Sequence, residues 1–166
     1  MPQGMRSSVL ENRQERVLSV CGHSIVGGMK AFDELVGSKW VGRSELWLDP
    51  LGDVLTEGTC TLEVQATGIT YTWTHKDETK TGSVILNESG GAFTDTFHSP
   101  TPMECRSLVG NRGLFLIEGS YGEKGEWGWL IGLSHRTPTG ELVLQMTNIA
   151  YWGEEARAVR FICKKQ

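Results

Sequence analysis

From Trp40 onward the sequence contains about ten short runs in which apolar and polar residues alternate, most of them bounded by Gly, Pro, Asn or Asp. The clearest run is Ile69–His75 (ITYTWTH), where large residues occupy the odd positions and threonines the even ones. Successive side chains of a β-strand point to opposite faces, so this run predicts a strand with one aromatic and one hydroxyl-bearing face. Many such strands in a small domain favour a closed barrel or a sandwich.

The spacing of the runs predicts a mainly β fold: an antiparallel up-and-down barrel of about ten strands. The connections are short, as at residues 66–68 and 88–90, which is typical of an antiparallel meander. Closure would remove exposed edges, and ten strands leave room for an interior cavity. A sandwich is the alternative, but alternation places Trp40, Trp73, Trp127 and Trp129 on one side, which favours a barrel. The predicted strands are residues 39–48, 54–66, 69–76, 81–87, 91–98, 102–108, 114–121, 127–135, 141–149 and 156–164.

The N-terminal part differs from the rest of the chain. Ser8 and Glu11 fit a capping box, and Gly22 would end the helix that follows. We therefore treat residues 1–28 as an appendage, helical or flexible, and residues 29–166 as the barrel domain. Residues 29–36 form a short amphipathic pattern, which predicts a helix that plugs one end of the barrel.

Composition limits the partners of the protein. The net charge of −4 argues against nucleic acid or an anionic membrane as the main partner. No apolar run approaches the roughly 20 residues that a membrane-spanning helix needs. The four cysteines form no C-x-x-C pair, so we expect buried, reduced thiols and a cytoplasmic location.

The segment Gly37–Gly42 (GSKWVG) resembles the start of the first strand in the calycin superfamily, which includes lipocalins, fatty-acid-binding proteins and nitrobindin-type haem barrels. Two residues separate Gly37 from Trp40 here, whereas lipocalins usually have one. About four-fifths of the chain also resembles uncharacterised bacterial lipocalin-like proteins, through Phe93–His98 (FTDTFH) and Gly119–Tyr121 (GSY). The resemblance implies a ligand-binding barrel in which Arg160 of the last strand, with Arg157 as the alternative, stacks on Trp40.

The resemblance also raises haem as an alternative ligand, since nitrobindin-type barrels take an axial histidine from near the C-terminal end. In this chain the last histidine is His135. We predict no resident cofactor and keep haem as an alternative.

Asp95 is the main candidate for a site residue. Alternation places its carboxylate between Phe93 and Phe97, where a charged group needs a polar partner. The alternative interpretation is that this face lies on the outer surface and that Asp95 is solvated. His98 alternates to the opposite face, so we do not expect it to cooperate with Asp95.

Histidines and aromatic residues supply the other candidates. His75 shares a face with Tyr71 and Trp73, and His135 shares one with Trp127 and Trp129, so each imidazole either binds a ligand or is an ordinary rim residue. Asn148, Tyr151 and Trp152 either ring an opening or pack loops. The predicted ligand-binding set is Trp40, Tyr71, Trp73, His75, Asp95, Trp127, Trp129, His135 and Arg160. No metal-ligand spacing and no nucleophile elbow is present, so we predict no metal site and leave the catalytic residues open.

These features favour a non-catalytic carrier or sensor that holds a small lipophilic or aromatic molecule inside the barrel. One alternative is an enzyme that uses Asp95 or a cavity histidine as a general base. The other is an interaction domain with a packed interior, which forms homo-oligomers through residues 1–28.

Overall fold

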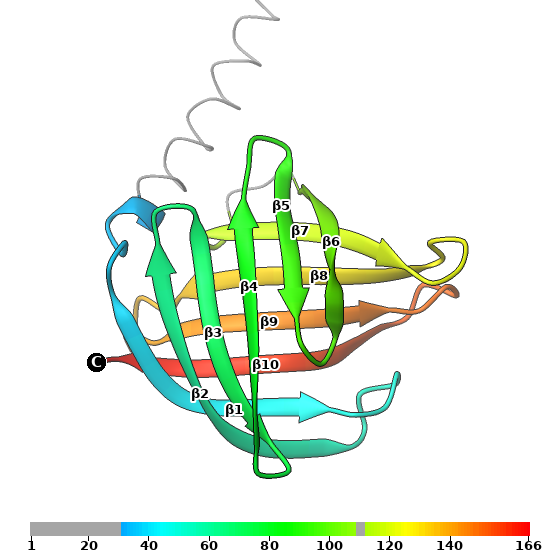
Figure 1. Ribbon diagram of the computed structural model, residues 1–166, viewed down its shortest axis with the longest axis horizontal. Helices are drawn as coiled ribbons and strands as arrows, with labels where there is room; N and C mark the ends of the chain where they lie inside the picture. Colours follow the sequence, from blue (N-terminus) through cyan, green and yellow to red (C-terminus); the bar gives the residue numbers. More distant parts are fainter. Residues whose placement is uncertain (1–30, 109–111) are drawn as a thin grey trace, which may run out of the picture.

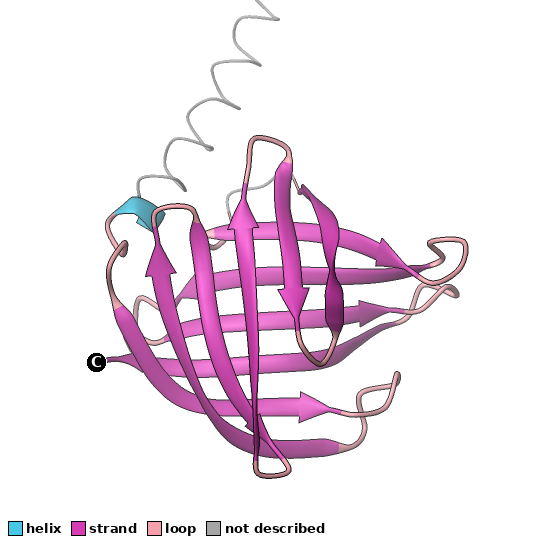
Figure 2. Cartoon of the chain, viewed as in Figure 1, coloured by secondary structure: helices cyan, strands magenta, loops and turns pink. Residues whose placement is uncertain are grey.

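The computed structural model describes residues 31–108 and 112–166 of the chain, and these form one closed antiparallel barrel (Figure 1). Each strand pairs with the next one along the chain, and β1 closes the ring by pairing with β10. The fold is therefore a ten-stranded meander, as the alternating runs predicted. Figure 2 shows that strands make up almost all of the described chain.

The strands agree with the predicted runs to within a few residues. Their bounds are β1 Lys39–Trp47, β2 Leu55–Gln65, β3 Gly68–His75, β4 Glu78–Leu86, β5 Gly90–Asp95, β6 Ser99–Ser107, β7 Phe115–Tyr121, β8 Trp127–His135, β9 Leu142–Ile149 and β10 Glu155–Lys165. Of the predicted plugging helix, one turn is described at residues 31–33, and its Phe32 is buried. The predicted appendage at residues 1–28 lies outside the described residues.

The antiparallel order gives the barrel two distinct ends. The connections that follow β1, β3, β5, β7 and β9 share one end, which we call the mouth, and the helical turn lies at the other end, which we call the base. Three of the mouth connections, β1–β2, β7–β8 and β9–β10, lie at the right of Figure 1. Each strand therefore presents one terminus to the mouth, and these termini are the positions from which a site can be assembled.

Aromatic side chains meet across the interior. The rings of Tyr71 on β3 and Phe161 on β10 lie 5.2 Å apart, although β2 and β1 separate these strands. Phe93 on β5 similarly stacks on Trp129 of β8 at 6.2 Å. At these levels side chains from opposite walls occupy the space that we had expected to be a cavity. Such contacts between buried aromatic rings add to the stabilisation that comes from burial itself.

The described cysteines are buried thiols. Cys60, Cys105 and Cys163 form no disulfide, in agreement with the expected reduced state. Sγ of Cys60 lies 3.5 Å from Sγ of Cys163. The fourth cysteine, Cys21, lies outside the described residues. Within residues 31–108 and 112–166, no helix has the length and apolar character required to cross a bilayer.

Candidate functional site

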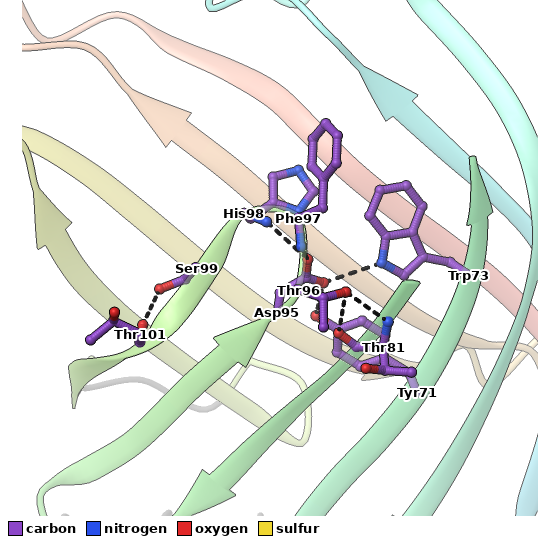
Figure 3. A network of polar contacts seen from close by, with 9 residues as sticks. All are labelled: Tyr71, Trp73, Thr81, Asp95, Thr96, Phe97, His98, Ser99 and Thr101. Atoms are coloured by element: carbon purple, nitrogen blue, oxygen red, sulfur yellow. Dashed lines mark hydrogen bonds and ion pairs between the residues drawn. The ribbon is translucent and has the colours of Figure 1, made fainter. Parts of the chain in front are cut away.

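The buried carboxylate of Asp95 organises a polar cluster at the mouth. Oδ2 accepts hydrogen bonds from the Tyr71 hydroxyl at 2.7 Å and from Nε1 of Trp73 at 3.2 Å (Figure 3). Oδ1 accepts hydrogen bonds from the backbone N–H groups of Phe97 at 2.8 Å and His98 at 2.9 Å. Asp95 is 1% exposed. Four donors thus satisfy a charge that burial alone would make unfavourable.

Gly82 allows Tyr71 to reach this carboxylate. Gly82 on β4 pairs with Tyr71 of β3 on one side and with Asp95 of β5 on the other. A Cβ atom at Gly82 would lie 2.2 Å from Cζ and from the hydroxyl oxygen of Tyr71, so a side chain there would collide with the phenol. Because Gly82 has no side chain, the ring of Tyr71 lies across β4, and its hydroxyl group reaches Asp95 on β5.

The position of His98 corrects our sequence interpretation. We expected a strand over residues 91–98, which would put His98 and Asp95 on opposite faces. Strand β5 instead ends at Asp95, because its side chain bonds the next backbone N–H groups and turns the chain. His98 folds back, so that its Nδ1 lies 3.4 Å from Oδ1 of Asp95, an ion-pair distance that is long for a hydrogen bond.

The same turn changes the environment of Phe97. We placed Phe97 on the strand face that carries Asp95, but it lies in the turn and is 41% exposed. Its ring still packs edge-on against His98 at 4.8 Å, Trp73 at 5.4 Å and His75 at 5.5 Å. Phe97 therefore covers the polar cluster from the mouth side (Figure 3).

His98 is held between two indoles. Its ring lies 5.6 Å from that of Trp73 and 5.2 Å from that of Trp129. The His98 side chain is 14% exposed, so part of the ring remains accessible. We call Tyr71, Trp73, His75, Asp95, Phe97, His98 and Trp129 the mouth cluster. Alternation predicted five of its members, and His98 and Phe97 were missed because the turn was read as strand.

The charge of Asp95 is fixed by its neighbours. Burial raises the pKa of this carboxyl group, but the interactions with His98 and the hydrogen bond from Tyr71 outweigh burial and lower the pKa to about 2. The pKa of Tyr71 is raised well above 10, first by burial and then by the negative charge of Asp95. At neutral pH the pair is therefore a carboxylate that accepts from a protonated phenol.

Three buried nitrogen atoms of the mouth cluster lack hydrogen-bond partners. They are Nδ1 of His75, Nδ1 of His98 and Nε1 of Trp129. Two of these atoms belong to histidines with a carboxylate nearby, Asp95 for His98 and Glu78 for His75. For Nε1 of Trp129, the described residues supply no hydrogen-bond acceptor. The indole Nε1 can only donate, and an unsatisfied buried polar group of this kind costs about 1–3 kcal/mol.

Two residues of the predicted binding set lie at the base instead. Trp40 is 2% exposed, donates from Nε1 to Oγ of Ser38 at 2.8 Å, and packs edge-on against His135 at 5.7 Å. Because β8 runs from mouth to base, its first residue, Trp127, and its last, His135, are at opposite ends. The structure therefore separates His75 from His135 and places Trp40 in the closure of the base.

Arg160 does not stack on Trp40. It follows the inward-facing Val159 and precedes the inward-facing Phe161, so it points away from the core. Its guanidinium bonds both carboxylate oxygens of Glu45, at 2.8 and 3.3 Å, and lies 5.9 Å from the ring of Trp47. The expected cation–π contact of the last strand is thus made on the outer face, with a different tryptophan.

A pocket of about 450 Å³ also lies on the outer face, across β1 to β5 and beside the C-terminal residue. Threonines that alternate with inward residues line it, among them Thr61, Thr72 and Thr81. Thr61 and Thr72 bond each other at 2.6 Å. The cross-strand hydroxyl pairs explain the lining as ordinary β-sheet stabilisation.

No set of three or more metal-ligating side chains gathers within the described part of the chain. The chain matches no protein-family model, and no curated protein matches it in sequence. The mouth cluster is therefore the feature from which a function can be inferred.

Proposed function

We propose that the protein binds a small planar aromatic or lipophilic molecule at the mouth cluster and acts as a carrier or sensor. The observation that carries the proposal is a pair of buried nitrogens in one aromatic cluster, Nε1 of Trp129 and Nδ1 of His75, for which the described residues supply no hydrogen-bond partner. Rings of the cluster connect these two atoms through His98 and Phe97, with centroid separations of 4.8 to 5.5 Å.

The cluster specifies the ligand by chemistry. Trp129 offers a donor, so the ligand must carry an acceptor such as a carbonyl, carboxylate or sulfonate oxygen. The indoles of Trp73 and Trp129 and the imidazole of His98 offer faces and edges for a planar ring. Apolar walls with a few fixed polar groups are the common composition of small-molecule sites.

The ionised Asp95 supports this function by positioning rather than by contact. Its two oxygens already accept four hydrogen bonds, which hold Tyr71, Trp73 and the turn at residues 96–98 in place. A site whose residues are locked in this way loses little conformational entropy on binding. We also retain the likeness to calycins and the cytoplasmic location as proposals, which the barrel and the reduced thiols support.

The first test is a titration with 8-anilinonaphthalene-1-sulfonate, an aromatic probe with sulfonate acceptors, followed by its own fluorescence. Replacing Trp129 with Phe keeps most of the aromatic surface and removes the N–H donor. We expect W129F to weaken binding about tenfold, the effect of roughly one hydrogen bond.

The matched control is H135Q, at the base of the same strand, which we expect to leave affinity unchanged. Native mass spectrometry of the purified full chain then asks whether a small molecule co-purifies and is lost from W129F. Absence of probe binding by the wild type, or equal affinities for wild type and W129F, would overturn the proposal.

A second candidate is an enzyme in which Asp95 orients His98 as a general base. The 3.4 Å approach of His98 Nδ1 to Oδ1 of Asp95 favours it, because a carboxylate at one imidazole nitrogen fixes the orientation of the ring and leaves the other nitrogen for proton transfer. The lowered pKa makes Asp95 itself a poor base near neutral pH. Release of p-nitrophenolate from p-nitrophenyl esters, abolished by H98Q and retained by H135Q, would support catalysis over carriage.

A further inference from the structure

Exposed apolar side chains are concentrated at the mouth. The described chain exposes eleven large hydrophobic side chains, and eight of them lie in or beside mouth connections. We call these eight the apolar rim: Leu48, Leu51, Val54, Leu55, Phe97, Tyr121, Tyr151 and Trp152. The remaining three, Val36, Val41 and Ile85, are on the helical turn and the barrel wall. Exposed apolar side chains that gather at one end of a molecule, rather than being scattered singly, indicate an interaction site.

Two of the connections that carry the rim lie close to each other. A Cβ atom at Gly52, in the β1–β2 connection, would lie 3.2 Å from the backbone of Arg157 and 3.4 Å from Cβ of Ala156. This connection therefore packs against the start of β10, next to the connection that carries Tyr151 and Trp152. The β1–β2 and β9–β10 connections lie on the same side of the molecule in Figure 1.

The aromatic part of the rim has a distinctive geometry. Trp127, Tyr151 and Trp152 have ring planes at 76° to 90° to one another, with centroids 4.9 to 5.9 Å apart. Tyr151 is 68% exposed and Trp152 is 51% exposed, so much of this ring surface faces solvent. We call these three residues the aromatic corner. Aromatic faces set in different planes attract a quaternary ammonium group through cation–π interactions.

The charges around the rim are mainly negative. Nε1 of Trp152 donates to Oε2 of Glu154 at 2.8 Å, which fixes a carboxylate beside the aromatic corner. The β1–β2, β7–β8 and β9–β10 connections and the first residue of β10 carry six carboxylates against one lysine: Asp49, Asp53, Glu123, Glu126, Glu154, Glu155 and Lys124. This balance repels an anionic surface and favours one that presents cationic groups.

We propose that the apolar rim docks the mouth on a lipid surface that presents choline headgroups, with the trimethylammonium group against the aromatic corner. The apolar side chains project from four separate connections and do not form a flat surface. A fluid lipid surface can accommodate such a shape. Tyr and Trp are well suited to the boundary between headgroups and acyl chains, because each combines an apolar ring with a polar O–H or N–H group. The carboxylates beside the apolar rim favour a zwitterionic lipid surface over an anionic one.

Docking would place the mouth cluster next to the phase in which a lipophilic molecule dissolves. In that role the inference rests on the proposed function, because it names the source of the ligand. The docking is tested at Tyr151 and Trp152, which lie outside the mouth cluster, so the two can fail separately.

The test is flotation of the full chain with phosphatidylcholine vesicles and, in parallel, with vesicles containing phosphatidylglycerol. We expect binding to phosphatidylcholine, weaker binding to the anionic vesicles, and release by tetramethylammonium chloride beyond that caused by equal sodium chloride. The double variant Y151A/W152A should lose about tenfold or more of the affinity. Far-ultraviolet circular dichroism confirms that each variant is folded.

The matched control is I85A, which removes a 55% exposed apolar side chain from the barrel wall and should bind as the wild type does. Absence of wild-type binding to phosphatidylcholine, a preference for the anionic vesicles, or equal losses in I85A and Y151A/W152A would overturn the docking proposal. The sulfonate-probe titration is run on the same variants. In the wild type, probe binding without docking on phosphatidylcholine rejects this inference alone, and docking without probe binding rejects the proposed function alone.

Discussion

The Tyr71 hydroxyl donates to Oδ2 of Asp95 at 2.7 Å across an intervening strand, passing over Gly82. Three consecutive strands thus contribute an aromatic ring, an absent side chain and a carboxylate to one arrangement. The relationship links packing to electrostatics, because the same contact that fills the space above Gly82 also stabilises the buried charge.

Replacing Gly82 with Ala should destabilise the fold and disturb the mouth cluster. The new Cβ would overlap the phenol of Tyr71, and overpacking of this kind costs about 1–3 kcal/mol. Urea unfolding measures the change. G132A is the matched control, since its Cβ would meet a side-chain methyl of Leu116 at 3.3 Å, so a smaller loss is expected. An equal loss in both variants would show that the Tyr71 contact has no special role.

Y71F should be destabilising although it removes one oxygen atom. Oδ2 of Asp95 would keep only the longer bond from Trp73, and a hydrogen bond to a charged group contributes about 1.5–3 kcal/mol. The pKa of Asp95 should rise, because the Tyr71 hydrogen bond helps to lower it. The control is Y151F, at a largely exposed tyrosine, which should leave the free energy of unfolding nearly unchanged. Similar unfolding free energies for Y71F and wild type would contradict this account.

The sequence determines the barrel more clearly than the site. Strict alternation in runs such as Ile69–His75 specifies which residues face inward, and short connections specify antiparallel neighbours. Both signals are local, and both led to the observed order of ten strands. Closure follows because a long meander is stabilised by pairing its two edges.

The site residues that were missed depend on a local competition. After Asp95 the backbone can either continue as a strand or turn, if the Asp95 side chain accepts hydrogen bonds from the backbone N–H groups two and three residues ahead. Alternation alone does not reveal which of the two will occur. The turn placed His98 beside Asp95, against our expectation. Arg160 was misassigned for a different reason: it faces outward between the buried Val159 and Phe161, and the register of β1 and β10 places it opposite Glu45.

Stability should fall in acid as Asp95 becomes protonated. Its pKa in the folded protein is about 2, below the ordinary value of 3.8, so the ionised form favours the folded state. The contribution is therefore complete above about pH 4 and is lost as the pH falls towards 2, a change on the order of 2 kcal/mol. Urea unfolding at a series of pH values measures it.

D95N should lower stability near neutral pH and reduce the fall in acid. The control is D77N, in an exposed turn with a positive φ angle that Asn tolerates, which should retain the wild-type pH profile. A D95N profile parallel to that of the wild type between pH 4 and pH 2 would show that other groups cause the acid sensitivity.

Replacing Arg160 with Met should reduce stability and leave ligand binding unchanged. Arg160 pairs with both oxygens of Glu45, which is 7% exposed. The variant R160M therefore leaves a buried carboxylate without its charged partner. We expect a loss of about 2 kcal/mol, less than the 3–5 kcal/mol found for fully buried pairs, because the arginine is partly exposed. The control R136M breaks the more exposed pair with Glu141, which should contribute no more than about 1 kcal/mol. Since Arg160 points outward, R160M should bind the sulfonate probe as tightly as the wild type. A selective loss of probe affinity in R160M, with stability intact, would instead return this residue to the binding site and contradict the assignment of its side chain to the outer face.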